Sequence, residues 1–326
     1  MYDVISVGSS TVDVFAKVES QMVKIKTPRH EDELIAYPHG SKILIKELQN
    51  LTGGGGTNCA VALARIGLKT AYLGKTGNDK NSTIILEKLE KEKVEFIGIS
   101  VKGCSGYSII LDSLEGDRTI LTYKGVNNEL KYKEIDIKKL KTKWFYFSSM
   151  VGESYTTLEK LSEYAKKNKI KTVFNPSNYL AEKGPKFLSK ILKRTDILIL
   201  NKDEASLIAG DYSADLLVKK LERLGPKQVV VTDGENGAYT CDSKYLLHAI
   251  PNKVNGIQTT GAGDAFAATY LAGIILGKST ENSLKMALIN AGSVITKIGA
   301  KGGLLNYKKI EERLKKNPPT ILKKKY

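Results

Sequence analysis

The chain has 326 residues, of which 41% are hydrophobic and 26% charged, as in a globular protein with a large core, which excludes a disordered or fibrous chain. Lysine and arginine exceed aspartate and glutamate by 51 to 35, a formal net charge of +16. The basic residues are spread along the chain rather than gathered in one stripe, so the pattern predicts solvated faces and no nucleic-acid partner. The three cysteines lie far apart, which excludes a disulfide framework, and neither they nor the three histidines have metal-ligand spacing. No apolar run is long enough to span a bilayer and no basic leader precedes the first strand, so we expect a cytoplasmic protein without a membrane partner.

Short β-rich runs alternate with helical patterns along most of the chain. The predicted strands are 3–8, 70–74, 94–100, 144–149, 171–175, 197–201 and 228–232, and the helical stretches between them include 58–66, 81–92, 155–167 and 215–224. This alternation indicates βαβ units, and the nearly continuous apolar strands indicate burial on both faces. The pattern therefore predicts an α/β fold with a mainly parallel central sheet. Residues 317–326, with two prolines and three lysines, are expected to fray.

Two stretches do not follow this alternation. Residues 14–51 contain two strand-like runs around a polar loop, and residues 105–123 have the pattern of a hairpin with its turn at 114–117. Four strands outside the βαβ series are enough for a small second sheet, and a lid over the end of the main sheet is the economical interpretation. We therefore expect an α/β core made of 1–13, 52–104 and 124–326, and a β-sheet lid made of 14–51 and 105–123.

The motif with the clearest chemistry is Thr259-Thr260-Gly261-Ala262-Gly263-Asp264, which precedes a helical run over 267–277. The backbone N–H groups of Gly261, Ala262 and Gly263 are expected to be available at the positive end of the helix dipole, where they form an anion pocket. Asp264 places a carboxylate beside it. A carboxylate at a helix start is often only a favourable cap. Beside an anion pocket, however, it supplies the proton acceptor that phosphoryl transfer to a hydroxyl needs.

A second glycine run, residues 53–56, opens another predicted helix. Glycines let a ligand lie against the backbone, and Asn58 can donate to and accept from neighbouring hydroxyls. A flexible turn before a helix is the alternative interpretation. Residues 74–76 do not end a phosphate-binding P-loop, because Lys69 stands where that motif needs a glycine. No GxGxxG follows the first strand, which disfavours a Rossmann dinucleotide site.

These two motifs, in this order and at this separation, resemble the ribokinase-like (PfkB) family of carbohydrate kinases, and the resemblance covers nearly the whole chain. Residues 7–13 resemble the first strand of the family with its substrate-binding aspartate. Further matching segments are 53–67 (the N-terminal signature), 74–79, 201–204 (the NxxE motif), 231–238 (the nucleotide-side strand and turn), 259–266 (the C-terminal signature), 290–292 and 299–300.

The resemblance implies a three-layer α/β/α fold with a β-sheet lid, and an ATP-dependent phosphotransferase with an alcohol group as acceptor. It implies that Asp264 deprotonates the acceptor hydroxyl and that Gly261, Ala262 and Gly263 form the anion hole. The residues implied to contact the acceptor are Asp13, Gly54, Gly55 and Asn58. Those implied to contact ATP are Asn201, Thr232, Gly234, Gly237 and Asn290, with Mg²⁺ near Glu204 and, through water, near Asn201. Because the lid often forms a dimer interface in the family, a homodimer is implied.

The identity of the acceptor is left open by the sequence. Residues 174–177 resemble the Asn-Pro stretch of ribokinase-type members, and no arginine follows before Arg194, where acid-sugar and fructose kinases usually have one, so a neutral sugar is favoured. Arg118 and Lys124 allow a sugar phosphate instead, with solvated hairpin charges as the alternative, and nucleosides are also accepted in the family. A non-catalytic ligand-binding protein on a kinase fold is disfavoured, because Asp264 and the glycine pocket are both intact.

One residue departs from the family pattern. The family usually has an aspartate before the two threonines of its C-terminal signature, and this chain has Gln258. In members activated by a monovalent cation, that carboxylate helps to hold the ion. Since a neutral amide oxygen is a weaker ligand for a hard cation, the sequence predicts little activation by potassium.

Overall fold

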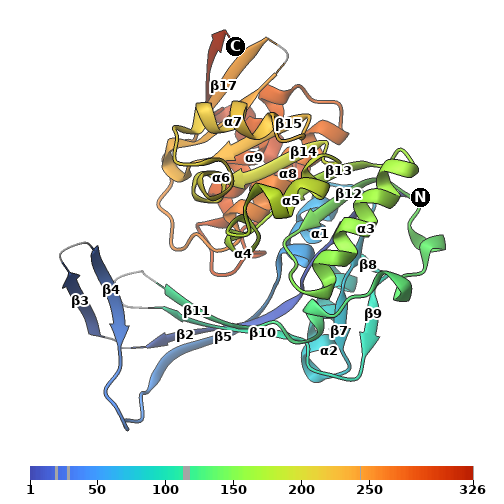
Figure 1. Ribbon diagram of the computed structural model, residues 1–326. Helices are drawn as coiled ribbons and strands as arrows, with labels where there is room; N and C mark the ends of the chain where they lie inside the picture. Colours follow the sequence, from blue (N-terminus) through green and yellow to red (C-terminus); the bar gives the residue numbers. More distant parts are fainter. Residues whose placement is uncertain (19–20, 28–29, 113–117, 243, 326) are drawn as a thin grey trace.

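The computed structural model describes residues 1–18, 21–27, 30–112, 118–242 and 244–325, and in these residues a ten-stranded sheet forms the centre of the molecule (Figure 1). From edge to edge its strands are β18 (Thr320–Lys325), β17 (Tyr245–Ile250), β16 (Ala238–Cys241), β15 (Gln228–Thr232), β14 (Ile197–Asn201), β13 (Lys171–Asn175), β12 (Thr142–Ser148), β1 (Tyr2–Val7), β6 (Thr70–Leu73) and β8 (Glu95–Phe96). Neighbours from β15 to β8 pair in parallel, whereas β16, β17 and β18 pair antiparallel. The predicted, mainly parallel sheet is confirmed.

Helices cover both faces of this sheet. One face carries α1 (Gly55–Arg65), α2 (Lys80–Lys91), α8 (Ala262–Ile275), α9 (Thr280–Val294) and α10 (Tyr307–Lys316); the other carries α3 (Glu153–Lys167), α4 (Asn178–Ala181), α5 (Gly184–Leu192), α6 (Lys202–Ala209) and α7 (Ala214–Glu222). Short 3-10 turns are η1 (Gly125–Asn128), η2 (Tyr132–Glu134), η3 (Ile137–Lys139) and η4 (Gly234–Asn236). Val4 belongs to one core and Ile5 to the other, because successive side chains of a strand point to opposite faces. Among the described helices, none is long and apolar enough to cross a bilayer.

A second sheet extends away from the core in Figure 1. Its strand order is β11 (Arg118–Tyr123), β10 (Gly106–Asp112), β2 (Thr11–Val18) and β5 (Ile45–Gly53). The hairpin predicted over 105–123 is present, and its turn at 114–117 lies outside the described residues. Because β2 already begins at Thr11, Asp13 lies on this small sheet. The division of the chain into a core and a lid remains a prediction.

The number of strands predicted within 14–51 was wrong. Besides β2 and β5, this stretch contains β3 (Gln21–Thr27) and β4 (His30–Ala36), which pair only with each other as a separate ribbon within the described residues. Charged residues such as Lys24 and Glu33 stand inside these two strands. A ribbon paired through backbone hydrogen bonds needs no continuous apolar face, so the sequence pattern did not reveal it.

Two further predictions were wrong. The strand predicted over 94–100 is split into β8 and β9 (Ile99–Val101), and β9 pairs with β7 (Lys75–Gly77) apart from the main sheet. Between them the chain passes so close to Gly74 that a Cβ atom on Gly98 would lie 2.2 Å from the Gly74 carbonyl oxygen. The C-terminal residues expected to fray instead form β18, because both prolines precede the strand and Ile321 packs against the core.

Candidate active site

A cavity of about 470 Å³ lies between the small sheet and the carboxyl ends of the central strands. Thr11, Asp13 and Ser108 line it from the small sheet, and residues at the ends of β12, β13, β14 and β15 line it from the core. The starts of α1 and α8 complete the wall. In open α/β sheets the carboxyl ends of the strands are where ligands bind, and this volume fits a small molecule.

Asp264 lies in the first turn of α8, behind the N-cap residue Gly261. Gly261 has a φ of +80°, and a Cβ atom there would lie 2.3 Å from the Cβ atom of Ala300, so the turn requires glycine. The amide of Ala262 donates to the Thr259 carbonyl oxygen at 3.2 Å, so the prediction that this N–H group is available was wrong. In the described part of the chain, the N–H groups of Gly261 and Gly263 have no such acceptor, and both residues line the cavity.

The Asp264 carboxylate is held by a side chain from the other glycine motif. The side-chain amide of Asn58 donates to Asp264 Oδ2 at 2.8 Å, and the Cys59 thiol lies 3.7 Å from Oδ1. Burial raises the pKa of Asp264 above its ordinary value, whereas the Asn58 hydrogen bond and the positive charge of Lys301 lower it. A carboxylate whose pKa is raised accepts a proton more strongly than an exposed aspartate does.

The glycine run before Asn58 allows α1 to begin very close to the end of β1. A Cβ atom on Gly56 would lie 2.7 Å from the carbonyl carbon of Gly8, so the two backbones touch. Gly54 has a φ of +90°, which favours glycine and turns the chain into the helix. Gly54, Gly55 and Asn58 all line the cavity. The glycine run therefore lets the start of α1 pack against the backbone at the end of β1, and it leaves the backbone of Gly54 and Gly55 open to a ligand in the cavity.

Asp13 enters the same cavity from β2. Its buried carboxylate accepts a hydrogen bond from the Thr11 hydroxyl at 2.7 Å. The carboxylate lies directly over the backbone of Gly53 on β5, where a Cβ atom would lie 1.8 Å from Asp13 Oδ2. A small molecule in the cavity therefore has Asp13 on the small sheet and Asp264 on the core as neighbours.

The NxxE motif forms the junction of β14 and α6. Asn201 Oδ1 accepts from the Glu204 N–H group at 2.8 Å, and Glu204 Oε2 accepts from the Asn201 N–H group at 3.0 Å, a capping box. Both residues line the cavity. Burial raises the pKa of Glu204 to about 7, and the charge of Asp264 adds to this rise. The motif therefore caps the start of α6 and also places on the cavity wall a carboxyl group that ionises less readily than an exposed glutamate.

The remaining predicted nucleotide contacts do not all reach this cavity. Thr232, at the end of β15, lines it, but Gly234 and Gly237 are not among its lining residues. Asn290 is completely buried: its amide nitrogen donates to Thr269 Oγ1 at 2.8 Å, and its oxygen accepts from the Leu305 N–H group at 2.9 Å. Asn290 thus joins α8, α9 and the segment before α10, and the structure does not bring it to the cavity.

Two lysines at the site carry little sequence signal. Lys301 was not predicted as a site residue. Its one sequence signal is its position directly after the matching segment Gly299-Ala300. Lys124 was weighed as a phosphate contact, and it lines the cavity with its ammonium group 5.0 Å from the centre of the Tyr179 ring. Burial lowers the pKa of Lys124, and the negative charge of Asp13 opposes this. The side chain of Arg118, its proposed companion, lies outside the described part of the structure.

Comparison with known proteins decides the family. The profile described as pfkB family carbohydrate kinase matches residues 3–306. The chain belongs to the PfkB family. An uncharacterized sugar kinase of Archaeoglobus fulgidus is 31% identical over 248 residues, which cover 75% of this PfkB chain and 98% of the relative. The PfkB match and the kinase relatives make this protein a phosphotransferase with a hydroxyl acceptor.

Two further comparisons concern ribokinases. The ribokinase of Bacillus subtilis is 28% identical over 282 residues, which cover 84% of this PfkB chain and 92% of the relative. The structure of Arabidopsis thaliana ribokinase complexed with ribose and ATP has a TM-score of 0.81 at 22% identity, and the match covers 96% of this chain and 99% of that one. The second likeness shows that the fold is ribokinase-like.

Proposed function

We propose that this PfkB kinase transfers the γ-phosphoryl group of ATP to a hydroxyl group of a small neutral sugar of the ribokinase type. The observation that carries the proposal is the position of Asp264, a half-buried carboxylate with a raised pKa, on the same cavity as Asp13 and the N–H groups at the start of α8. A proton acceptor, a holder of hydroxyls and an anion site are the parts that this transfer needs.

Each part has a separate task in the reaction. Asp13 accepts hydrogen bonds from sugar hydroxyls, while Asp264 takes the proton from the hydroxyl that attacks. The N–H groups of Gly261 and Gly263 donate to the phosphoryl oxygens, which carry the charge in the transition state. Thr232 and Asn201, at the ends of neighbouring strands, lie on the ATP side of the cavity.

Glu204 and Asn201 fit a magnesium ion carried by the nucleotide. Burial raises the pKa of Glu204, and a nearby dication restores its charged form. Within the described residues no group of three or more His, Cys, Asp or Glu side chains is arranged to hold a metal, so a bound magnesium ion would need water and phosphate oxygens as its other ligands. When bound, the ion neutralises charge on the phosphate oxygens.

The test is a panel of sugars, sugar phosphates and nucleosides, assayed for ADP release with ATP and magnesium. We expect the highest kcat/KM with a neutral sugar. A nucleoside that exceeds every sugar contradicts the sugar assignment but keeps the kinase. Specific ligand binding without ADP release for any compound contradicts the kinase and leaves a ligand-binding protein.

Lys124 supports a second candidate, a sugar-phosphate acceptor. A half-buried ammonium group on the cavity wall provides a partner for a phosphate on the acceptor. If such an acceptor is used, Lys124→Met raises its KM by about 10- to 100-fold, the value of a charge-assisted hydrogen bond. KM for neutral sugars serves as the internal control and stays within about twofold. An equal effect on both substrates removes Lys124 as a phosphate contact.

We expect little dependence of the rate on potassium at constant ionic strength. Gln258 is buried, and its neutral amide offers a cation a weaker ligand than the carboxylate usual at this position. The measurement replaces sodium by potassium at fixed total salt, because salt also screens the attraction of a basic protein for ATP. Several-fold activation by potassium alone contradicts the prediction, and Gln258→Asp is the complementary variant, in which we expect a cation response to appear.

A homodimer that forms through the small sheet is the assembly we propose. One face of this sheet lines the cavity, and the other exposes Leu48, Ile109, Leu121 and Tyr123. Ile109 pairs with Leu121 across β10 and β11, so these side chains share a face. Light scattering should give about twice the chain mass of 35.8 kDa, and Leu121→Lys should halve it. Leu216→Lys, at another exposed leucine on α7, is the control, and a monomeric parent contradicts the proposal.

A further inference from the structure

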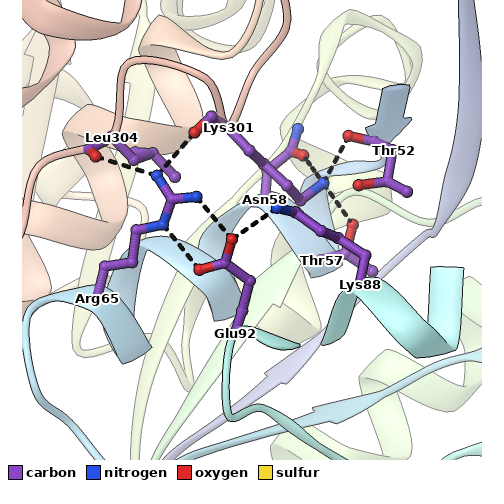
Figure 2. Close-up of polar contacts among 8 residues, drawn as sticks. All are labelled: Thr52, Thr57, Asn58, Arg65, Lys88, Glu92, Lys301 and Leu304. Carbon is purple, nitrogen blue, oxygen red and sulfur yellow. Dashed lines mark hydrogen bonds and ion pairs between the residues drawn. The ribbon is translucent and has the colours of Figure 1, made fainter. Parts of the chain in front are cut away.

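Lys301 lies between α9 and α10 with its ammonium group in the interior, beside the start of α1 (Figure 2). Its Nζ atom donates to the Thr52 carbonyl oxygen at 2.8 Å, to Thr57 Oγ1 at 3.1 Å and to Asn58 Oδ1 at 2.5 Å. An ammonium group has three donors and no acceptor, so these oxygens satisfy it completely. Lys301 is only 6% exposed, and a cation buried to this extent is costly unless it is paired.

The ammonium group decides which way the Asn58 amide points. The oxygen and nitrogen of an amide exchange places by a half-turn of the group, and only the hydrogen-bond partners distinguish them. Because Lys301 can only donate, the Asn58 oxygen must face it. The Asn58 nitrogen is then turned toward Asp264 Oδ2, 2.8 Å away. In the opposite orientation, an amide oxygen would face a carboxylate oxygen and a nitrogen would face an ammonium group, both repulsive.

We propose that Lys301 is a positioning residue for phosphoryl transfer: through Asn58 it holds one oxygen of Asp264 and leaves the other, which has only the weak donor of the Cys59 thiol 3.7 Å away among the described residues, for the proton of the acceptor hydroxyl. The inference rests on the proposed role of Asp264 as the base. Lys301 itself lies behind Asn58 and does not line the cavity, so it acts without touching the substrate.

The turn that carries Lys301 is also held through its backbone. Arg65, at the end of α1, donates to the carbonyl oxygens of Lys301 at 2.8 Å and Leu304 at 3.0 Å (Figure 2). The same guanidinium group forms two hydrogen bonds to Glu92, at 2.8 and 2.6 Å, and Lys88 pairs with Glu92 at 2.8 Å. A two-pronged pair of this kind fixes geometry as well as charge. Backbone and side chain of Lys301 are therefore both anchored to α1, the helix that carries Asn58.

The charge of Lys301 also acts on Asp264. The titratable groups that face Asp264 are Asp13, Glu204, Cys59, Tyr146 and Lys301. Lys301 is the positive member of this set, and the two carboxylates oppose it. Burial lowers the pKa of Lys301 to about 8, and the charges of Asp13 and Asp264 draw it back up, so the group is mainly charged at neutral pH. A positive charge favours the ionised form of Asp264, so its loss raises the pKa of Asp264 and moves the acid side of the rate profile to higher pH.

The first test is the pH dependence of kcat/KM in the Lys301→Met variant. We expect kcat to fall about 10-fold or more and the acid side of the profile to move up by about one pH unit, the effect of losing one nearby charge and its hydrogen bond. Lys301→Gln, which can still form hydrogen bonds, should fold even where methionine does not, and should show the same shift. KM for ATP should change less than about twofold.

Lys75→Met is the matched control. Lys75 is another buried lysine, 4% exposed, whose Nζ donates to the Glu129 carbonyl oxygen at 2.9 Å and pairs with Glu134 away from the cavity. Its loss should lower the thermal midpoint without moving the pH profile. A Lys301 variant that behaves in this way, with lower stability and an unmoved profile, overturns the proposal.

A double-mutant cycle tests whether Lys301 acts through Asn58. At a pH where Asp264 is ionised in every variant, the effect of Lys301→Met on kcat should largely disappear in an Asn58→Leu background, because the amide that it orients is gone. Additive effects overturn the proposal. Near-normal turnover of Asp264→Asn would instead show that Asp264 is not the base. That result contradicts the proposed function, and it is obtained with Lys301 unchanged, so the two failures can be told apart.

Discussion

Asp264→Asn should lower turnover by about 100-fold or more while leaving nucleotide binding nearly unchanged. The substitution preserves the shape of the side chain, and its amide oxygen can still accept the hydrogen bond that Asn58 donates at 2.8 Å. What is lost is the proton acceptor. The measurement is kcat with the preferred acceptor, together with the dissociation constant for ATP in a calorimeter.

The pH profile separates this loss from a disturbed fold. Burial raises the pKa of Asp264, so the parent should lose activity as the pH falls, at a value above that of an ordinary aspartate. In the Asp264→Asn variant this acid side should vanish from the residual rate. Asp211→Asn, at an exposed aspartate beyond α6, is the matched control and should keep both the rate and the profile. Turnover near the parent value in Asp264→Asn would remove this residue from its role.

Gly261→Ala should cost about 2–5 kcal/mol of the free energy of unfolding and abolish most of the activity. An alanine at a φ of +80° costs about 1–2 kcal/mol, and its Cβ atom would lie 2.3 Å from that of Ala300, an overlap that costs about 1–3 kcal/mol more. Moving either residue displaces the start of α8 and with it Asp264. Denaturant titration measures the loss of stability, and unchanged stability would show that the turn does not depend on glycine.

Gly263→Ala distinguishes the anion site from the turn. A Cβ atom on Gly263 meets no protein atom within 4 Å, and its backbone is not left-handed. Alanine in a helix is more stable than glycine by about 0.5–1 kcal/mol, so we expect equal or higher stability. Because Gly263 lines the cavity, the added methyl group occupies the space of the phosphoryl oxygens, and kcat should fall. A variant with normal kcat would contradict the anion site at the start of α8.

The parts of the fold that sequence reasoning predicted correctly depend on local pattern. The strand over 197–201 and that over 171–175 have the predicted bounds, because a short apolar run between turn residues is enough to define a buried strand. The split at Gly98 and the ribbon of β3 and β4 depend on a close backbone approach and on pairing between distant residues. Such contacts leave no periodic signal in one segment.

The same limit applies to the site. Asp13, Asn58 and Asp264 stand in motifs of glycines and short polar residues, whose backbone requirements are visible in the sequence. Lys301 is one lysine in a lysine-rich chain, and its role arises only when the segment after α9 folds against the start of α1. Asn290 shows the converse: a polar residue in a matching segment is used entirely for interior hydrogen bonds.

The C-terminal strand has a consequence for solubility. β18 forms one edge of the ten-stranded sheet, and Lys323, Lys324 and Lys325 stand on it. Edge strands present unpaired backbone groups to other chains, and lysines on them oppose edge-to-edge aggregation by charge repulsion. A chain shortened before Thr320 would make β17 the edge, and Leu246, Leu247 and Ala249, now buried, stand on that strand. β18 thus protects the edge of the sheet against aggregation. A preparation lacking this strand should aggregate at protein concentrations at which the whole chain stays in solution.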